Sequence, residues 1–181
     1  MKTDQWIRLN PPDRLDATDW ALLEVLQDDA RVSYTELGRR VGLSSPAVAE
    51  RVRRLEDVGV VQGYRAELGL AKLGLPVMAF VRIRYPSGDY RPIRLAIEAE
   101  RAILECHHVT GEDCFVAKVA TRSMEELETV VGRLAKLGGT TTSVVFSTVL
   151  ERRQIRRDDR DTARAADDHG ALMRKPAARS R

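Results

Sequence analysis

Apolar residues in the first third of the chain recur every three or four positions, which is the spacing of amphipathic helices. The first predicted helix begins at Asp16, a candidate N-cap with Asp19 at the third helical position. Leu22 and Leu26 lie on its apolar face. The chain is therefore expected to open with a short amphipathic helix.

Two further helices follow at close spacing. The second begins in the capping-box pattern of residues 33–36 and ends at Gly42. The third begins at Ser45-Pro46, where serine is expected to cap the helix, and ends at Gly59. Because a three-residue turn containing a glycine separates them, the two helices predict a helix-turn-helix. A turn pair within residues 60–66 predicts a small wing hairpin.

The second half of the chain has a different pattern. Residues 77–84 alternate apolar and polar side chains, as in a half-buried strand. Two helices are expected, over residues 92–100 and from the capping box at Ser123 onward. Three more strands are expected over residues 103–109, 114–120 and 140–150. The order β-α-β-β-α-β is that of a ferredoxin-like split unit.

These elements predict an α+β protein of two domains and a tail. The boundaries are a winged helix-turn-helix over 13–67, a linker over 68–75, a ferredoxin-like domain over 76–152 and a basic, disordered tail over 153–181. A ferredoxin-like sheet carries helices on one face only, so its other face needs a cover. A second copy of the chain is the simplest cover, which predicts a homodimer.

Composition narrows the class of protein. The 181 residues contain no apolar run long enough for a membrane helix and no N-terminal signal pattern. Two cysteines are too few for a disulfide framework or a complete zinc site. These features predict a cytoplasmic protein with no membrane association.

The placement of charge matters more than its sum. The net charge of +3 is mild for a nucleic-acid-binding protein. Residues 11–30 carry six acids against one arginine, whereas residues 31–54 carry six arginines against two glutamates. The second and third predicted helices therefore form a positive edge on a domain whose first helix is acidic.

Longer stretches of the sequence resemble the Lrp/AsnC family of transcriptional regulators. In the first half the resemblance rests on Leu15-Asp16-Ala17-Thr18-Asp19, Leu22-Leu23, Leu26-Gln27-Asp28-Asp29-Ala30-Arg31, Leu37-Gly38-Arg39-Arg40-Val41-Gly42-Leu43-Ser44, Arg51-Val52-Arg53-Arg54-Leu55-Glu56 and Gly59-Val60-Val61-Gln62-Gly63-Tyr64. In the second half it rests on Val109-Thr110-Gly111-Glu112-Asp113 and Gly138-Gly139-Thr140-Thr141-Thr142-Ser143. It covers residues 13 to 153 or so.

The resemblance implies a sequence-specific, nucleoid-associated regulator of bacterial or archaeal transcription that forms dimers and assembles further to tetramers or octamers. It implies no cofactor, but a small-molecule effector, an amino acid or related metabolite. With two reading heads related by a dyad, the expected partner is double-stranded DNA with a pseudo-palindromic operator.

The third predicted helix is the candidate recognition helix. Its early residues are expected nearest the base edges if the helix enters the major groove N-terminus first. Ser45 and Glu50 can then hydrogen-bond bases, and Ala47 can touch a thymine methyl. Arginines and Tyr34 around it are candidates for phosphate, and some of the arginines for guanine. The full predicted DNA-binding set is Tyr34, Arg39, Arg40, Ser44, Ser45, Pro46, Ala47, Glu50, Arg51, Arg53 and Arg54.

The resemblance places the effector near a glycine loop and the last strand, between sensing domains of neighbouring subunits. Carboxylates there suit an α-ammonium group, and hydroxyls suit an α-carboxylate. Family members commonly have an aspartate at the position of Cys114, which leaves open which of Glu112 and Asp113 meets the ligand. The predicted set is Thr110, Gly111, Glu112, Asp113, Thr140, Thr142 and Ser143.

Alternatives come from other classes of protein. A haem-precursor (siroheme) decarboxylase shares the two-domain plan by resemblance, and His107, His108, Arg82 and Arg84 would supply its chemistry. A nonspecific DNA-organising protein would use the same helix-turn-helix. A metal cluster at Cys106-His107-His108 with Cys114 is disfavoured, because strand neighbours point to opposite faces. Cys114 as a redox sensor also remains an alternative. The chain is predicted not to be an enzyme.

Overall fold

The computed structural model describes residues 15–157, and they form two compact units. The first comprises the described residues up to Arg65 and those from Arg152, and the second comprises Ala66–Glu151. No helix within residues 15–157 is long and apolar enough to cross a membrane.

Three helices build the first unit: α1 (Ala17–Asp28), α2 (Tyr34–Val41) and α3 (Ser45–Asp57). The capping box predicted at Asp16 and Asp19 is present, with each backbone N–H bound by the other residue's carboxylate. The N-cap of α3 is Ser44, one residue before the predicted Ser45, and its hydroxyl accepts from the N–H of Ala47 at 3.4 Å. Pro46 consequently lies within the first turn, where no N–H is needed.

The turn between α2 and α3 depends on two glycines. Gly42 ends α2 in the left-handed region, at φ 73°. Gly38 lies where the turn folds back on α2, and its carbonyl accepts from the N–H of Leu43 at 2.9 Å. A Cβ at position 38 would collide with the carbonyl oxygen of Leu43. The sharp turn seats Leu22, Leu26, Leu37, Val48 and Val52 in one small core.

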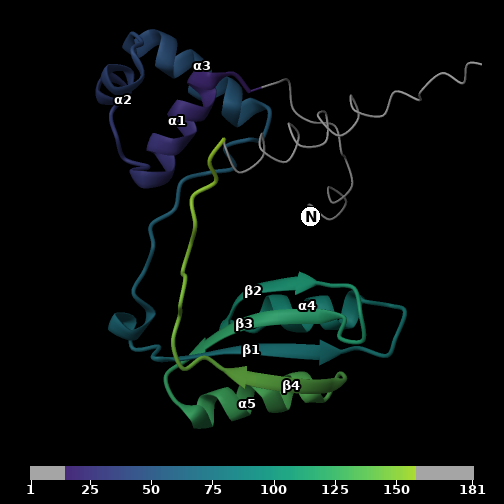
Figure 1. The fold of residues 1–181 in the computed structure, drawn as a ribbon. Helices are drawn as coiled ribbons and strands as arrows, with labels where there is room; N and C mark the ends of the chain where they lie inside the picture. The colour runs from purple at the N-terminus through teal and green to yellow at the C-terminus, as the bar shows by residue number, and fades with distance from the viewer. Residues whose placement is uncertain (1–14, 158–181) are drawn as a thin grey trace, which may run out of the picture. The chain divides into compact units, whose positions relative to one another are not determined.

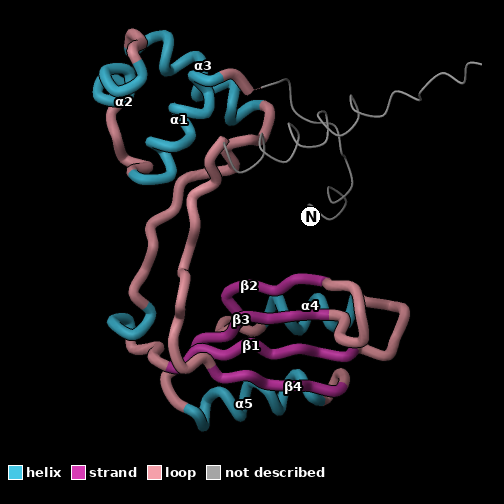
Figure 2. The backbone as a smooth tube through the Cα atoms, viewed as in Figure 1, coloured by secondary structure: helices cyan, strands magenta, loops and turns pink. Residues whose placement is uncertain are grey.

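The predicted wing hairpin is wrong for the described structure, because residues 60–66 form no strand (Figure 2). The N–H groups of Val60 and Val61 instead both donate to the carbonyl of Leu55 and close the end of α3. The hydroxyl of Tyr64 donates to the carboxylate of Glu56 at 2.9 Å. Backbone groups that a hairpin requires are thus used to cap the helix.

A segment from the end of the described chain binds α1. The side-chain amide of Gln27 donates to the carbonyl of Ile155 at 3.0 Å and accepts from its N–H at 2.9 Å. Gln154 also donates to the carboxylate of Asp28. Residues 153–157 of the predicted tail therefore belong to the first unit and contact α1. Residues 158–181 of that tail lie outside the described residues.

The second unit is a four-stranded antiparallel sheet with two helices (Figure 1). A short 3-10 helix, Leu70–Leu73, precedes it within the predicted linker. The strand order is β2-β3-β1-β4. Its elements are β1 (Val77–Arg84), α4 (Arg91–Ala99), β2 (Ile103–His108), β3 (Phe115–Thr121), α5 (Met124–Ala135) and β4 (Gly139–Val144). This is the predicted ferredoxin-like arrangement.

One face of the sheet is buried under the helices. Val81 and Ile83 of β1 pack there with Ile93 of α4 and with Leu127 and Leu134 of α5. The alternate β1 side chains, among them Phe80, Arg82 and Arg84, are exposed on the opposite face. We call this opposite side the open face.

The last strand is shorter than predicted. β4 ends at Val144 and not near residue 150, and the following chain is loop (Figure 2). Ala79 is the β1 partner of Val144, and the N–H of Val145 donates to the carbonyl of Met78. Because β1 begins at Val77, only Met78 and Val77 remain beyond this pair as partners for a longer β4. High β-propensity in residues 145–150 cannot extend a strand that has no neighbour.

Candidate nucleic-acid interface and effector site

The candidate recognition helix α3 is amphipathic, with a buried stripe of Val48, Val52 and Leu55. Glu50 and Arg53 are exposed on the other side. Within residues 15–157 neither of these two side chains makes a hydrogen bond or an ion pair. Both groups are therefore available to a ligand.

Arg51 and Arg54, one turn apart on α3, are bound to the start of α1. The Nη1 of Arg51 donates to Asp16 at 2.7 Å and to Asp19 at 2.9 Å. The Nη2 of Arg54 donates to the other carboxylate oxygen of Asp19 at 2.5 Å. We call these four residues the helix clamp. The clamp joins the recognition helix to the capping box of α1.

Burial and charge strengthen the clamp. The side chain of Asp19 is only 1% exposed, so water competes little for its oxygens. The N–H of Asp19, and next to it Arg51, hold the pKa of Asp16 below its ordinary value. The carboxylates of Asp16 and Asp19 in turn raise the pKa of Arg51. Arg51 and Arg54, both predicted to contact DNA, therefore already have carboxylate partners within the protein.

The two arginines of α2 share one acid. Arg39 makes two hydrogen bonds to Glu36, at 2.8 and 2.9 Å, and Arg40 makes one at 2.8 Å. Hydrogen bonds from Arg39 and then Arg40 lower the pKa of Glu36 to about 2. Glu36 therefore does not complete the capping box predicted with Ser33, whose hydroxyl alone caps α2.

The other predicted DNA-binding residues surround these pairs. Tyr34 is 41% exposed at the first position of α2. Ser44 and Pro46 are exposed at the start of α3, and Ser45 and Ala47 are half-buried there. The structure thus places the whole predicted set on α2, α3 and the turn between them, and shows which members already have partners.

A cluster of opposite charges lies at the end of β1 on the open face. The Nη2 of Arg84 donates to Glu112 at 3.2 Å, and Arg82 lies 3.7 Å from Asp113. These acids belong to the predicted effector loop, in which Gly111 has φ 115°. We call Arg82, Arg84, Glu112 and Asp113 the open-face cluster. It offers both signs of charge to one ligand.

Arg82 and Arg84 were predicted only as part of the enzyme alternative and were not grouped with the effector loop. The signal was present in the alternation of β1, which puts both arginines opposite the buried Val81 and Ile83. What the sequence lacked was the strand order. Cys114 donates its N–H to the carbonyl of Ile83, which fixes the loop beside the end of β1.

The predicted effector residues on β4 do not share one face. Thr140 and Thr142 pair with Ile83 and Val81, so their side chains lie on the helix-covered side. Ser143 pairs with Phe80 on the open face. The structure therefore brings Ser143, but neither threonine, to the side of the sheet that carries the open-face cluster.

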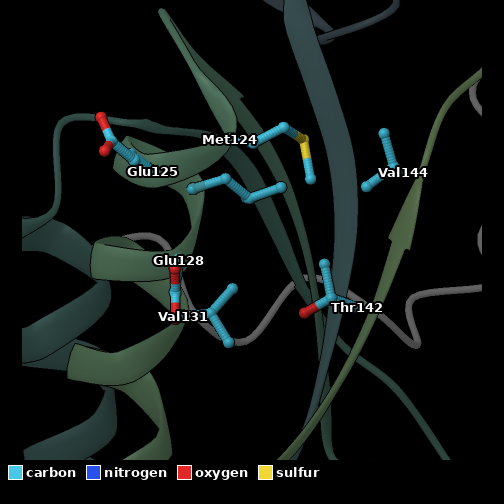
Figure 3. Close-up of a pocket in the computed structure, with 7 residues that line it drawn as sticks. Met124, Glu125, Glu128, Val131, Thr142 and Val144 are labelled. Carbon is cyan, nitrogen blue, oxygen red and sulfur yellow. The ribbon is translucent and has the colours of Figure 1, made fainter.

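Thr142 instead lines a groove of about 490 Å³ between α5 and β4. Figure 3 shows Met124 of α5 extending toward β4, from which Thr142 and Val144 point back. The lining is mainly apolar, with Glu125 and Glu128 at its α5 side.

The cysteines and histidines of β2 and the adjoining loop do not converge. Cys106 pairs with Ala117 on the covered side, and burial raises the pKa of its thiol. The ring of His108 stacks on Phe115 at 4.7 Å. The Sγ of Cys114 donates to the carbonyl of Tyr85 at 3.5 Å. Residues 15–157 contain no group of three or more potential metal ligands.

A helix-turn-helix with an exposed, arginine-bearing second helix, joined to a ferredoxin-like domain, defines a two-domain DNA-binding regulator. Family models match both parts: an AsnC-type helix-turn-helix domain over residues 15–56 and an Lrp/AsnC ligand binding domain over residues 78–155. The chain belongs to the Lrp/AsnC family of transcriptional regulators, which confirms the predicted family and fold class.

Individual relatives agree with this membership. The transcriptional regulator LrpC of Bacillus subtilis is 35% identical over 136 residues, which cover 75% of this chain and 94% of LrpC. The leucine-responsive regulatory protein of Haemophilus influenzae is 36% identical over 142 residues, or 75% of this chain and 86% of that protein. Both are named as regulators, which supports the regulator over the decarboxylase alternative.

Solved structures show the same fold. The structure of B. subtilis LrpC has a TM-score of 0.74 at 34% identity and covers 77% of this chain and 100% of its own. A feast or famine regulatory protein from M. tuberculosis, complexed with L-methionine, has a TM-score of 0.72 at 35% identity, with 78% and 99% covered. A Neisseria meningitidis regulator complexed with L-methionine has a TM-score of 0.72 at 28% identity, with 78% and 96% covered.

Proposed function

We propose that this transcriptional regulator reads a pseudo-palindromic operator through the exposed side of α3 and works at the nucleoid. The observation that carries the proposal is that one side of α3 is buried in the core and the other side is exposed. Glu50 and Arg53 face outward without partners in residues 15–157, next to the exposed Pro46. A helix entering the major groove would present these side chains to base edges and phosphates.

The open face is the proposed dimer interface. Phe80 is 42% exposed in the middle of β1, and Met78 is half-buried beside it. A second copy packed face to face would cover both and place two α3 helices about a dyad. From its family we also expect dimers of this chain to assemble into tetramers or octamers. Sedimentation velocity of the full chain tests this expectation.

The open-face cluster is the proposed effector site. Arg82 and Arg84 suit the α-carboxylate of an amino acid, and Glu112 and Asp113 suit its ammonium group. A ligand bound there would replace the Arg82–Asp113 and Arg84–Glu112 ion pairs with ion pairs to its own charged groups. Two relatives complexed with L-methionine support the amino-acid class. The chain has no proposed cofactor and no proposed enzymatic activity.

One experiment tests this function as a whole. In vitro selection from a random duplex library, with and without a mixture of amino acids, is expected to return a two-fold symmetric site whose occupancy changes with the mixture. Half-sites should lie about one helical turn apart or a multiple of it. Recovery of unrelated sequences at equal affinity would favour the nonspecific DNA-organising alternative.

A further inference from the structure

The helix clamp has a property that DNA binding alone does not require. Among residues 15–157, Asp19 is the one carboxylate that is fully buried. Both of its carboxylate oxygens accept hydrogen bonds from arginines of α3, one from Arg51 and the other from Arg54. Asp16 adds a second carboxylate to Arg51. Two of the three arginines clustered on α3 are therefore neutralised within the protein.

The geometry of this pairing matches what DNA backbone would offer. An arginine guanidinium recognises a carboxylate and a phosphate through the same N–H groups. Arg54 is still 46% exposed and Arg51 32%, so neither is sealed away from a passing duplex. Arg53, about 100° around the helix from Arg54, faces solvent without such a partner. The positive charges of Arg51 and Arg54 are therefore paired within the protein, whereas that of Arg53 is exposed to solvent.

We propose that Asp16 and Asp19 act as an internal substitute for phosphate and limit the nonspecific DNA affinity of this regulator. By occupying Arg51 and Arg54, they keep these groups from neutralising backbone phosphates. Phosphate contacts carry no direct sequence information and supply nearly all of nonspecific affinity. The clamp thereby lowers the affinity of this regulator for arbitrary DNA. The inference rests on the proposed use of α3 in DNA binding.

The test measures binding of the full chain to a duplex of random sequence over a series of salt concentrations. Asp19→Asn removes the charge that neutralises Arg54 and leaves Arg51 with Asp16, so the salt slope should steepen by about 0.9. The double variant Asp16→Asn with Asp19→Asn should steepen it by about 1.8 and bind random duplex more tightly. Glu24→Gln, the matched control, removes an acid of α1 that has no partner within residues 15–157, and should leave the slope unchanged.

Two results would overturn the inference. One is a folded double variant with the wild-type slope; the other is a Glu24→Gln slope as steep as that of Asp19→Asn. Circular dichroism of each variant establishes whether it folds. A wild-type chain that binds no duplex at low salt would overturn the proposed function as well, which separates the two failures.

Arg54→Ala covers the case in which the asparagine variants fail to fold. If Arg54 is held by Asp19 in the complex with random duplex, its removal should leave the salt slope unchanged. If Arg54 neutralises a phosphate there, the slope should become shallower by about 0.9, and the inference is wrong.

Discussion

The helix clamp and the open-face cluster use the same chemistry in opposite ways. Both join two arginines to two neighbouring acids. In the clamp, Asp19 is 1% exposed and receives arginine nitrogens at 2.9 Å and closer. In the open-face cluster, Glu112 is 88% exposed, and Arg82 lies 3.7 Å from Asp113.

The difference shows how burial determines the role of an ion pair. Asp19 also accepts the N–H of Asp16 and sits under α3, so its partners are fixed by the packing of two helices. Glu112 belongs to a loop and meets only the end of one strand. An exposed pair of this kind contributes little to folding, and its members can change partner at small cost. The clamp therefore holds structure, and the cluster is open to exchange with a ligand.

The largest effect is expected from Asp19→Ala. It removes the acceptor of three hydrogen bonds, and the free energy of unfolding of the first unit should fall by about 2–3 kcal/mol, since the arginines left behind still reach water. Glu112→Ala should change the stability of the second unit by no more than about 0.5 kcal/mol. Urea unfolding followed by the fluorescence of Trp20 in α1 reports the first unit, and far-UV circular dichroism at the same urea concentrations also reports the second. Equal losses would erase the comparison.

Arg84→Ala should have its effect on ligand and not on folding. Loss of one charge-assisted hydrogen bond of about 1.5–3 kcal/mol weakens amino-acid binding by about 10- to 150-fold. Isothermal titration with each of the twenty amino acids, first on the wild-type chain, measures it. Thr142→Val, on the opposite side of the sheet, is the control and should bind normally. A normal Arg84→Ala affinity would place the effector elsewhere.

Arg53→Ala is expected to affect DNA binding alone. Its exposed side chain has no partner in residues 15–157, so stability should change by less than about 0.5 kcal/mol. The salt slope of operator binding should become shallower by about 0.9 if Arg53 meets a phosphate. A fluorescence-anisotropy titration at several salt concentrations provides both the slope and the affinity. An unchanged affinity and slope would remove Arg53 from the interface.

The smallest expected effect is on the pH dependence of stability at acid pH. Because the pKa of Glu36 is about 2 in the folded chain against an ordinary 4.5, its pairing with Arg39 and Arg40 stabilises the first unit above pH 4.5. That contribution disappears as the pH falls toward about 2. Glu36→Gln should therefore melt slightly below the wild type near pH 6, and the difference should close near pH 2. A difference that is constant with pH would contradict this role for the pair.

Much of the fold could be predicted because its signals are local. The capping box at Asp16, the stripe of Val48 and Val52, and the alternation of β1 each depend on neighbours within a few residues. The wing and the length of β4 could not be predicted in this way. Val60 and Val61 cap α3 through the carbonyl of Leu55, a local contact that the turn pattern did not indicate. The length of β4 depends on β1, a partner far away in the sequence.

The candidate site followed the same division. The sequence identified α3 and its arginines by spacing and charge. It could not show that Arg51 and Arg54 turn toward α1, because Asp19 lies more than 30 residues earlier in the chain. Nor could the sequence show that Ser143, and not Thr142, lies on the same face of the sheet as the loop acids. That assignment requires the register of β4 on β1.

The most direct test observes the arginine side chains themselves. In a ¹⁵N-labelled chain, the Nε–Hε resonance of Arg53 should shift when the selected operator duplex is added, whereas those of Arg51 and Arg54 should stay in place. Subsequent addition of the amino acids should shift the resonances of Arg82 and Arg84. Shifts of Arg51 and Arg54 as large as that of Arg53 on adding DNA would contradict the account, because the clamp would then be part of the DNA-contacting surface.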